Sequence, residues 1–363
     1  MTLEDRLRRT LALPDDQAPY GQALRLLLED ASSAGVSDVH LNPTPGGLEV
    51  LYRRDGVLLP QGLIDSARAE RVIGKVKVLA GLLTYRHDVP QDGQIPAAQA
   101  GGRSDVRVSL FPTVHGEKAV LRFFLHDSDQ FDLDRLGYAP AVATRLRAAA
   151  ARPDGVILLT GPSGSGKTTA IYSLLREIAQ PSGGIRRNVV TIEDPVEHAI
   201  PGITQSQVNP PAGLTFAAAL RSLLRQDPQV ILVGEIRDRE TAHVAMEAGL
   251  TGHLVISTIH SGTAAGVAVR VLEMGIEPHV LTASLSCILA QRLSRRLDRP
   301  GRQVIAELLE MDDGLRRVIA GNPTRTDLEE AAVRGGMIPL REDAARLIRE
   351  GRIAPEEAAR VLG

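Results

Sequence analysis

The stretch that decides the fold of this chain is Gly161-Pro162-Ser163-Gly164-Ser165-Gly166-Lys167-Thr168-Thr169. It matches G-x-x-x-x-G-K-[ST], the pattern of a loop that binds nucleotide phosphates. An apolar run, 156–159, precedes it and a segment compatible with a helix, 170–180, follows it. This is the strand–loop–helix context in which backbone N–H groups and a helix N-terminus face phosphate oxygens. Lys167 is then expected at the β- and γ-phosphates and the Thr168 hydroxyl on Mg²⁺, with a glycine-rich structural turn as the alternative.

Length and composition narrow the class of protein. The 363 residues are enough for two or three domains. Aromatic residues make up only 3% and Trp is absent, so Leu, Val, Ile and Ala must fill the cores. The net charge of −2 argues against a surface that binds nucleic acid throughout. The one cysteine, Cys287, lies among apolar residues, which predicts a buried thiol and excludes both a disulfide and a four-cysteine metal site.

The sequence carries no recognisable export or membrane signal. The first sixteen residues are charged and lack the apolar segment of a signal peptide. No apolar run approaches the ~18 residues that a membrane-spanning helix needs. We therefore expect a protein of the cytoplasm, or one peripheral on a membrane face.

From about residue 155 onward, apolar strands alternate with helical patterns, which predicts an α/β fold. Near-continuous Val, Ile and Leu strands between helices are typical of a parallel sheet covered on both faces. The expected strands are 155–160, 188–192, 230–233 and 253–258. The expected helices are 167–179, 216–226, 239–248, 264–273 and 280–293.

The chain before about residue 127 has a different pattern, typical of a separate small α+β domain. The expected helices are 22–34 and 67–79, and the expected strands are 38–41, 48–53, 103–110 and 117–124, the last two forming a hairpin. The polar residues 126–129 are expected to begin the connection to the second domain, and the chain beyond about 322 is expected to be helical.

Two acidic residues follow apolar strands of the predicted parallel sheet. Glu235 follows 230–233, where a carboxylate can hold Mg²⁺ through water, and Glu193 lies in the acidic segment 191–197. Clustered acids are costly to bring together without a cation or a proton, so a metal or an attacking water would explain them. The alternatives are a buried strand that happens to end in an acid and a solvated turn ended by Pro195.

Two histidines, His253 and His260, bracket the expected strand 253–258. Seven residues of extended chain separate them too far to share one metal ion, which argues against a zinc site. His260 is a candidate sensor of the γ-phosphate, and a structural histidine is the alternative.

Together these elements resemble the superfamily of ATPases that power type II secretion and type IV pilus assembly. Residues 161–169 resemble its Walker A loop, 191–197 its aspartate box, 224–238 its Walker B region and 251–260 its histidine box. In the N-terminal part, segments 37–41, 54–57, 90–93 and 115–117 match as well.

The resemblance implies a RecA-like P-loop ATPase domain behind a smaller N-terminal α+β domain, working with ATP and Mg²⁺ in a homo-oligomeric ring, a hexamer. It implies that Arg107 and Arg122 reach the nucleotide from the smaller domain, and that Glu193 and Glu235 serve the attacking water and Mg²⁺ in an order left open. By itself each arginine could equally be a solvated strand residue. The implied partner is an inner-membrane platform protein, the implied location is the cytoplasmic face of that membrane, and no nucleic acid is expected.

The resemblance divides the chain into an N-terminal extension, the arginine-supplying domain, a linker, the ATPase domain and a C-terminal helical segment. Their expected bounds are 1–26, 27–126, 127–140, 141–320 and 321–363. The sequence departs from the family in three ways: about 25 residues stand in place of a docking domain, the four-cysteine zinc module is missing, and Ser261-Gly262 replaces Thr-Asn. Secretion, pilus assembly and competence systems therefore all stay open.

Five arginines follow the histidine box: Arg292, Arg295, Arg296, Arg299 and Arg302. We interpret them as a solvated helix face with neighbours three and four residues apart, the alternative being a surface for anionic lipid or an acidic helix. Two other functions stay open for the chain: a scaffold that binds nucleotide with little turnover, and a nucleic-acid motor on the same core.

Overall fold

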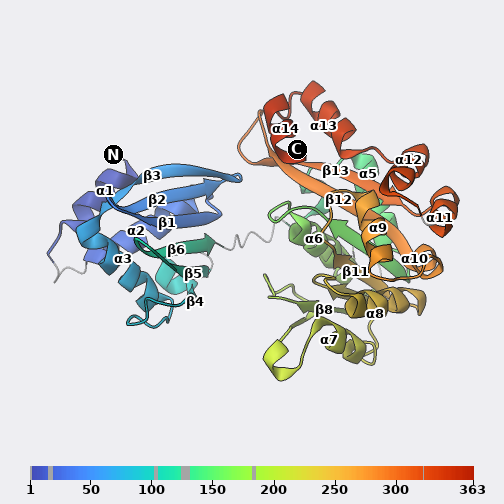
Figure 1. The fold of residues 1–363 in the computed structure, drawn as a ribbon, viewed down its shortest axis with the longest axis horizontal. Helices are drawn as coiled ribbons and strands as arrows, with labels where there is room; N and C mark the ends of the chain where they lie inside the picture. Colours follow the sequence, from blue (N-terminus) through green and yellow to red (C-terminus); the bar gives the residue numbers. More distant parts are fainter. Residues whose placement is uncertain (1, 15–18, 102–104, 124–130, 182–184, 322) are drawn as a thin grey trace. The chain divides into compact units, whose positions relative to one another are not determined.

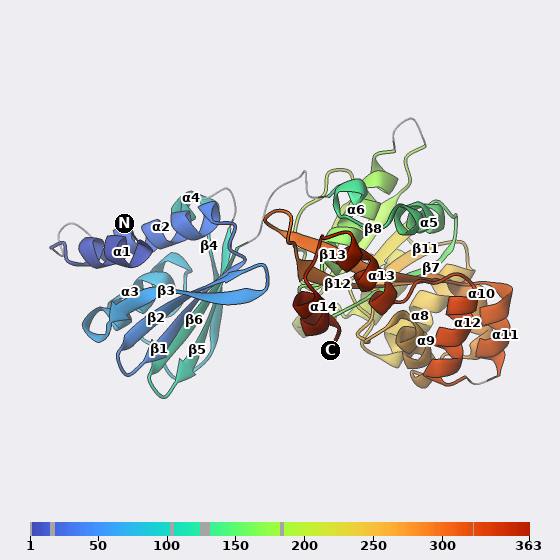
Figure 2. The same cartoon turned by 90° about the horizontal axis from the view of Figure 1, so that it is seen from above.

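The computed structural model describes residues 2–14, 19–101, 105–123, 131–181, 185–321 and 323–363. The chain divides into two compact units, Met1–Asp127 and Ser128–Gly363 (Figure 1, Figure 2). Each unit has its own sheet and its own core. The expected connection begins outside the described residues, and its described part belongs to the second unit, where Leu133 is fully buried.

The first unit is an antiparallel six-stranded sheet with helices packed on one face, an α+β architecture. The strand order is β3-β2-β1-β6-β5-β4. The strands are β1 (Asp38–Thr44), β2 (Gly47–Arg54), β3 (Val57–Asp65), β4 (Gln91–Ile95), β5 (Val106–Thr113) and β6 (Gly116–Phe123). The helices are α1 (Leu3–Leu11), α2 (Pro19–Ser33), α3 (Ser66–Leu79) and the short α4 (Ala97–Ala100).

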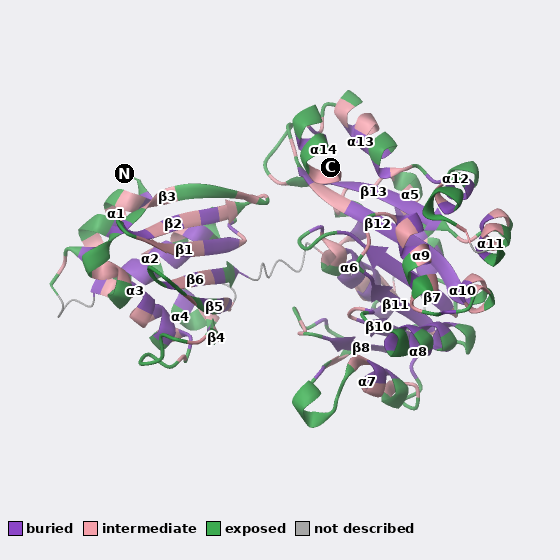
Figure 3. Cartoon of the chain, in the orientation of Figure 1, coloured by how far each residue is buried: buried purple, intermediate pink, exposed green. Residues whose placement is uncertain are grey.

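Alternation along the strands separates a buried face from an open one in this first sheet (Figure 3). Val106, Val108 and Leu110 of β5 are buried in one core with residues of α2 and α3. The residues between them point to the other face, which carries Arg107 on β5 and Arg122 on β6. The residues before 27 are part of the same core, because α1 buries its leucines there.

The second unit is the α/β fold that the sequence predicts, built on a seven-stranded sheet. The strand order is β13-β12-β7-β11-β10-β8-β9, and every neighbouring pair except β12 and β13 is parallel. The strands are β7 (Gly155–Thr160), β8 (Val189–Glu193), β9 (Thr204–Gln207), β10 (Val230–Val233), β11 (Leu254–Thr258), β12 (Leu285–Arg295) and β13 (Arg302–Glu310).

Helices cover both faces of this sheet, as buried parallel strands require. One face packs against α7 (Phe216–Leu223), α8 (Arg239–Leu250), α9 (Ala264–Glu273), α10 (Pro278–Ser284), α11 (Asp313–Ala320) and α12 (Arg325–Arg334). The other face packs against α5 (Pro140–Ala150) and α6 (Lys167–Ala179). The last helices, α13 (Leu340–Arg349) and α14 (Pro355–Leu362), enclose a small apolar cluster with Ile305 of β13.

The predicted helix 280–293 is wrong in its second half. Helix α10 ends at Ser284, and the apolar run that follows is β12, which is hydrogen-bonded between β7 and β13. A short apolar run that is buried on both sides has the same pattern in a helix and in a central strand. The arginines from Arg292 onward consequently lie on the β12–β13 hairpin, and the interpretation of that run as one helix face is also wrong.

Two further features bear on the expected character of the chain. Cys287 is buried in β12, and this burial raises the pKa of its thiol to about 12. None of the helices in the described ranges has the length and apolar character that a bilayer span requires.

Candidate nucleotide site

The phosphate-binding loop connects β7 to α6 in the second unit, as the sequence predicts. Gly161 has a backbone φ of 145°, and a Cβ there would lie 2.4 Å from the carbonyl oxygen of Gln291. Gly166, with φ of 87°, is the N-cap of α6 and supplies no side-chain cap. The other helices that follow sheet strands at this edge begin with a capping side chain, Asp238 for α8 and Thr263 for α9. The first N–H groups of α6 are therefore left for an anion.

Lys167 is held over the loop by backbone oxygens. Its ammonium donates hydrogen bonds to the carbonyl of Gly161 at 2.8 Å and to that of Pro162 at 3.0 Å. Burial lowers the pKa of Lys167, and the charge of the nearby Arg292 lowers it further. Arg292 is fixed in turn by a hydrogen bond of 2.6 Å from Nη2 to the carbonyl of Gly262. A half-buried pair of cations beside an uncapped helix N-terminus favours an anionic ligand.

The carboxyl ends of four neighbouring strands bring the predicted residues together. In the order β7-β11-β10-β8, the loop follows β7, His260 follows β11, Glu235 follows β10 and Glu193 ends β8. Lys167, Thr168, Glu193, Glu235 and His260 all line one cavity of about 180 Å³. This clustering at one edge follows from parallel pairing and is where open α/β sheets bind ligands.

Glu235 is the more accessible of the two predicted acids. One of its oxygens pairs with Arg237, and the other lies 3.7 Å from Nε2 of His260. Its side chain keeps 15% of its surface exposed. Glu193 has only 4% of its surface exposed, and both of its oxygens accept hydrogen bonds from neighbouring side chains. Glu235 is thus the acid that a hydrated cation in the cavity would meet first.

His253 and His260 occupy opposite ends of β11. His253 precedes the strand, and its Nδ1 lies 3.2 Å from the carbonyl oxygen of Ala248, away from the cavity. His260 lines the cavity and has 67% of its side chain exposed. Of these two histidines, His260 alone is at the candidate site.

Arg107 and Arg122 belong to the first unit, whereas the cavity lies entirely in the second. They are directly opposite each other on β5 and β6, the hairpin that the sequence predicts, although its outermost predicted residues, Arg103 and Phe124, lie outside the described residues. Nε of Arg122 donates a hydrogen bond of 2.7 Å to Asp38, and the Arg122 side chain is 60% exposed. Like charges directly opposite on a sheet destabilise it, which suits a face that meets an anion.

Sequence reasoning missed Tyr172, Phe216 and Thr258, which also line the cavity. Tyr172 could have been found, because it follows Thr168 by four residues on a predicted helix and therefore shares its face. Phe216 begins α7, and nothing in its local sequence pattern indicates a site.

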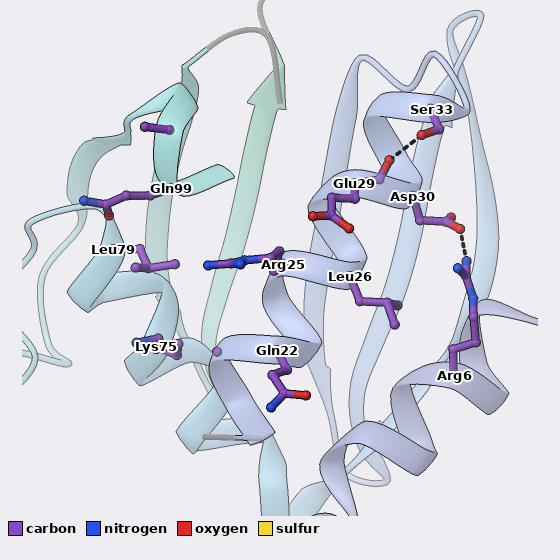
Figure 4. A pocket seen from close by; sticks show the side chains of 12 residues that line it. Arg6, Gln22, Arg25, Leu26, Glu29, Asp30, Ser33, Lys75, Leu79 and Gln99 are labelled. Atoms are coloured by element: carbon purple, nitrogen blue, oxygen red, sulfur yellow. Dashed lines mark hydrogen bonds and ion pairs between the residues drawn. The ribbon is translucent and has the colours of Figure 1, made fainter. Parts of the chain in front are cut away.

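A larger cavity, of about 910 Å³, lies in the first unit between α2 and α3. Figure 4 shows its lining, in which Arg6 pairs with Asp30 and Ser33 donates to the backbone of Glu29. None of the predicted site residues lines it. Chemistry, and not volume, therefore assigns the nucleotide to the smaller cavity.

The fold and this loop define the class: the chain is a RecA-like P-loop ATPase with a smaller N-terminal α+β unit. Residues 14–360 match the model of the family described as type II/IV secretion system protein, and the chain belongs to that family.

Characterised relatives carry names from two kinds of machine. The chain is 39% identical to the type IV pilus assembly ATPase PilB of Thermus thermophilus, over 94% of this chain and 43% of that protein. It is also 39% identical to the type II secretion system protein HxcR of Pseudomonas aeruginosa, over 95% of this chain and 78% of that one. The chain thus spans less than half of the first relative and about four fifths of the second.

A solved structure supports the nucleotide assignment. The pilus retraction motor PilT, determined with bound ADP, superposes with a TM-score of 0.70 at 27% identity, covering 93% of this chain and 96% of that one. The DotB ATPase of Yersinia pseudotuberculosis superposes with a TM-score of 0.74 at 22% identity, and this likeness concerns the fold alone. The family and this neighbour support nucleotide binding by the chain.

Proposed function

We propose that the chain is an ATP-hydrolysing motor that powers assembly of pilin or pseudopilin fibres in a type II secretion or type IV pilus system. The observation that carries this proposal is the single cavity that gathers the loop lysine and threonine with Glu193, Glu235 and His260. The relatives named for these two systems support the pathway. Hydrolysis there would depend on positioning and charge stabilisation, with little covalent chemistry by the protein.

The residues of the cavity fit a magnesium nucleotide. The uncapped N-terminus of α6 and the ammonium of Lys167 suit the phosphates, and the Thr168 hydroxyl would hold Mg²⁺ with Glu235 and Glu193 reaching it through water. Bound Mg²⁺ would neutralise the charge that develops on the phosphates. Glu193 or Glu235 would orient the attacking water, and His260 would sense the γ-phosphate.

Arg107 and Arg122 would complete the site from the first unit. An arginine aimed at the developing charge of a phosphoryl group contributes about 10³–10⁵ in rate. Their adjacent positions on one open sheet face support a shared role toward an anion. We propose that residues 27–126 form this arginine-supplying domain and 141–320 the ATPase domain, with 1–26 and 321–363 as terminal additions and 127–140 as the connection.

The motor would act as a homo-hexamer at the cytoplasmic face of the inner membrane, through contact with a platform protein. The names of its relatives, proteins of secretion and pilus machines, support this placement. No nucleic acid is part of the proposal.

Mixing two inactive variants tests the shared site. Arg107→Ala and Lys167→Ala subunits should each lose ATP turnover, and a mixture should regain activity because some sites then combine an intact lysine with an intact arginine. The measurement is steady-state phosphate release across mixing ratios. A simple dilution curve would contradict sharing. Wild-type protein that binds ATP with negligible turnover would favour a scaffold, and ATPase activity stimulated several-fold by DNA would favour a nucleic-acid motor.

A further inference from the structure

The surroundings of Glu193 leave its carboxylate one free acceptor position. Oε1 accepts hydrogen bonds from the Thr191 hydroxyl at 2.6 Å and from Nε2 of Gln205 at 3.1 Å. Oε2 accepts one from the hydroxyl of Tyr172. An ionised carboxylate offers about four lone-pair sites, two on each oxygen, so the remaining site is on Oε2. Glu193 and Tyr172 both line the nucleotide cavity, and the Tyr172 bond fixes how that oxygen is turned within its wall.

The Tyr172 hydroxyl is itself held in one orientation. The backbone N–H of Glu197 donates to its oxygen at 3.3 Å, so the hydroxyl proton is directed to Glu193. The side chain is 1% exposed, and burial together with the charge of Glu193 raises the pKa of the phenol. The tyrosine therefore stays a donor throughout the pH range in which the chain is folded. A buried donor locked on both sides orients a carboxylate as the third member of a catalytic triad orients its base.

An aromatic contact places the Tyr172 ring. Phe131 lies with its ring centroid 5.5 Å from that of Tyr172, at an interplanar angle of 54°, and 5.4 Å from the ring of His198. Phe131 is the first described residue of the second unit, directly after the segment that joins the two units. The same aromatic side chain thus adjoins the connection in sequence and the ring of Tyr172 in space.

We propose that Tyr172 is the positioning residue that aims the free lone pair of Glu193 at the attacking water, and that Phe131 links this tyrosine to the connection between the two units. The inference rests on the proposed function, because it gives Glu193 the task of orienting water and leaves Glu235 to Mg²⁺. Movement of the first unit would then reach Glu193 through two ring contacts and one hydrogen bond.

Tyr172→Phe tests the first part, since it removes the hydroxyl and keeps the ring. We expect kcat for ATP to fall about 10–100-fold with KM changed by less than about threefold, the pattern of a misplaced group that acts after binding. Tyr52→Phe is the matched control, because the buried Tyr52 hydroxyl donates to a carboxylate, Asp30, at 3.1 Å in the first unit. It should keep the wild-type kcat, and thermal melting of both variants identifies any loss that comes from unfolding.

A double-mutant cycle with Glu193→Gln separates a positioning role from a structural one. If Tyr172 acts through Glu193, adding Tyr172→Phe to Glu193→Gln causes no further loss of kcat. A multiplicative loss, or a wild-type kcat in Tyr172→Phe while Glu193→Gln is impaired, would overturn the inference and leave the proposed function standing. A wild-type kcat in Glu193→Gln would instead refute the role of Glu193 on which both depend.

Phe131→Leu tests the link to the connection. It keeps an apolar side chain and removes the ring that touches Tyr172. We expect kcat to fall in the wild-type background and to stay unchanged when the substitution is added to Tyr172→Phe. A wild-type kcat in Phe131→Leu, or an additional loss in the double variant, would overturn the link.

Discussion

Gly161→Ala should abolish nucleotide binding at physiological concentrations because the loop has no room for a methyl group. The added Cβ would lie 2.4 Å from the backbone carbonyl oxygen of Gln291 and 2.6 Å from the Ser165 hydroxyl, against 3.4 Å for the start of ordinary contact. The loop must therefore shift by about 1 Å, and a displacement of that size in a positioned site costs about 10² in rate or binding, equivalent to about 2.7 kcal/mol. The strained φ of 145° adds about 1–3 kcal/mol of folding free energy.

The assay is titration with a fluorescent ATP analogue, paired with urea denaturation. Gly252→Ala is the control, since Gly252 also has a positive φ, 95°, but a Cβ there meets open space. Both variants should lose stability, and only Gly161→Ala should lose at least about 100-fold in affinity. Equal affinities in the two variants would refute the claim that this close approach shapes the phosphate site.

Two predictions concern acids outside the cavity. Glu307→Ala should reduce the free energy of unfolding by about 2–4 kcal/mol in urea denaturation, because Glu307 accepts the buried N–H groups of Ala264 at 2.7 Å and Leu340 at 3.0 Å. Glu310→Ala, an exposed acid of the same strand, should change it by less than about 0.5 kcal/mol, and similar losses in both would contradict this role. Hydrogen bonds from Arg360 and Arg295 lower the pKa of Glu357 from 4.5 to about 2, so its stabilisation is present above pH 4.5 and is lost as the pH falls through about 2. Denaturation of Glu357→Gln at several pH values should show a deficit against wild type that shrinks in that window, and a deficit independent of pH would exclude the ion pairs as its cause.

The sequence predicts the nucleotide site well because the site is local in sequence and regular in topology. The loop pattern identifies Lys167 and Thr168, and parallel pairing alone brings Glu193, Glu235 and His260 to the same edge of the sheet. Strand β7 and helix α6 have the predicted bounds. These elements follow from chain-local periodicity and from the rule that carboxyl ends of parallel strands share an edge.

What escapes prediction depends on pairing between distant segments. The run that forms β12 is read as helix because its burial between β7 and β13 is a tertiary fact that no local pattern carries. The hydrogen bond from Tyr172 to Glu193 joins residues 21 positions apart on different elements. The edge strands β3 and β4 were missed because exposed, mixed residues blur the alternation that marks a half-buried strand.

The central claim is that the cavity beside Lys167 hydrolyses ATP. Steady-state phosphate release by the wild-type chain and by Lys167→Ala, both checked for folding by circular dichroism, tests it most directly. The account predicts turnover in the wild type and none above background in the variant. Equal phosphate release by the two proteins would contradict it.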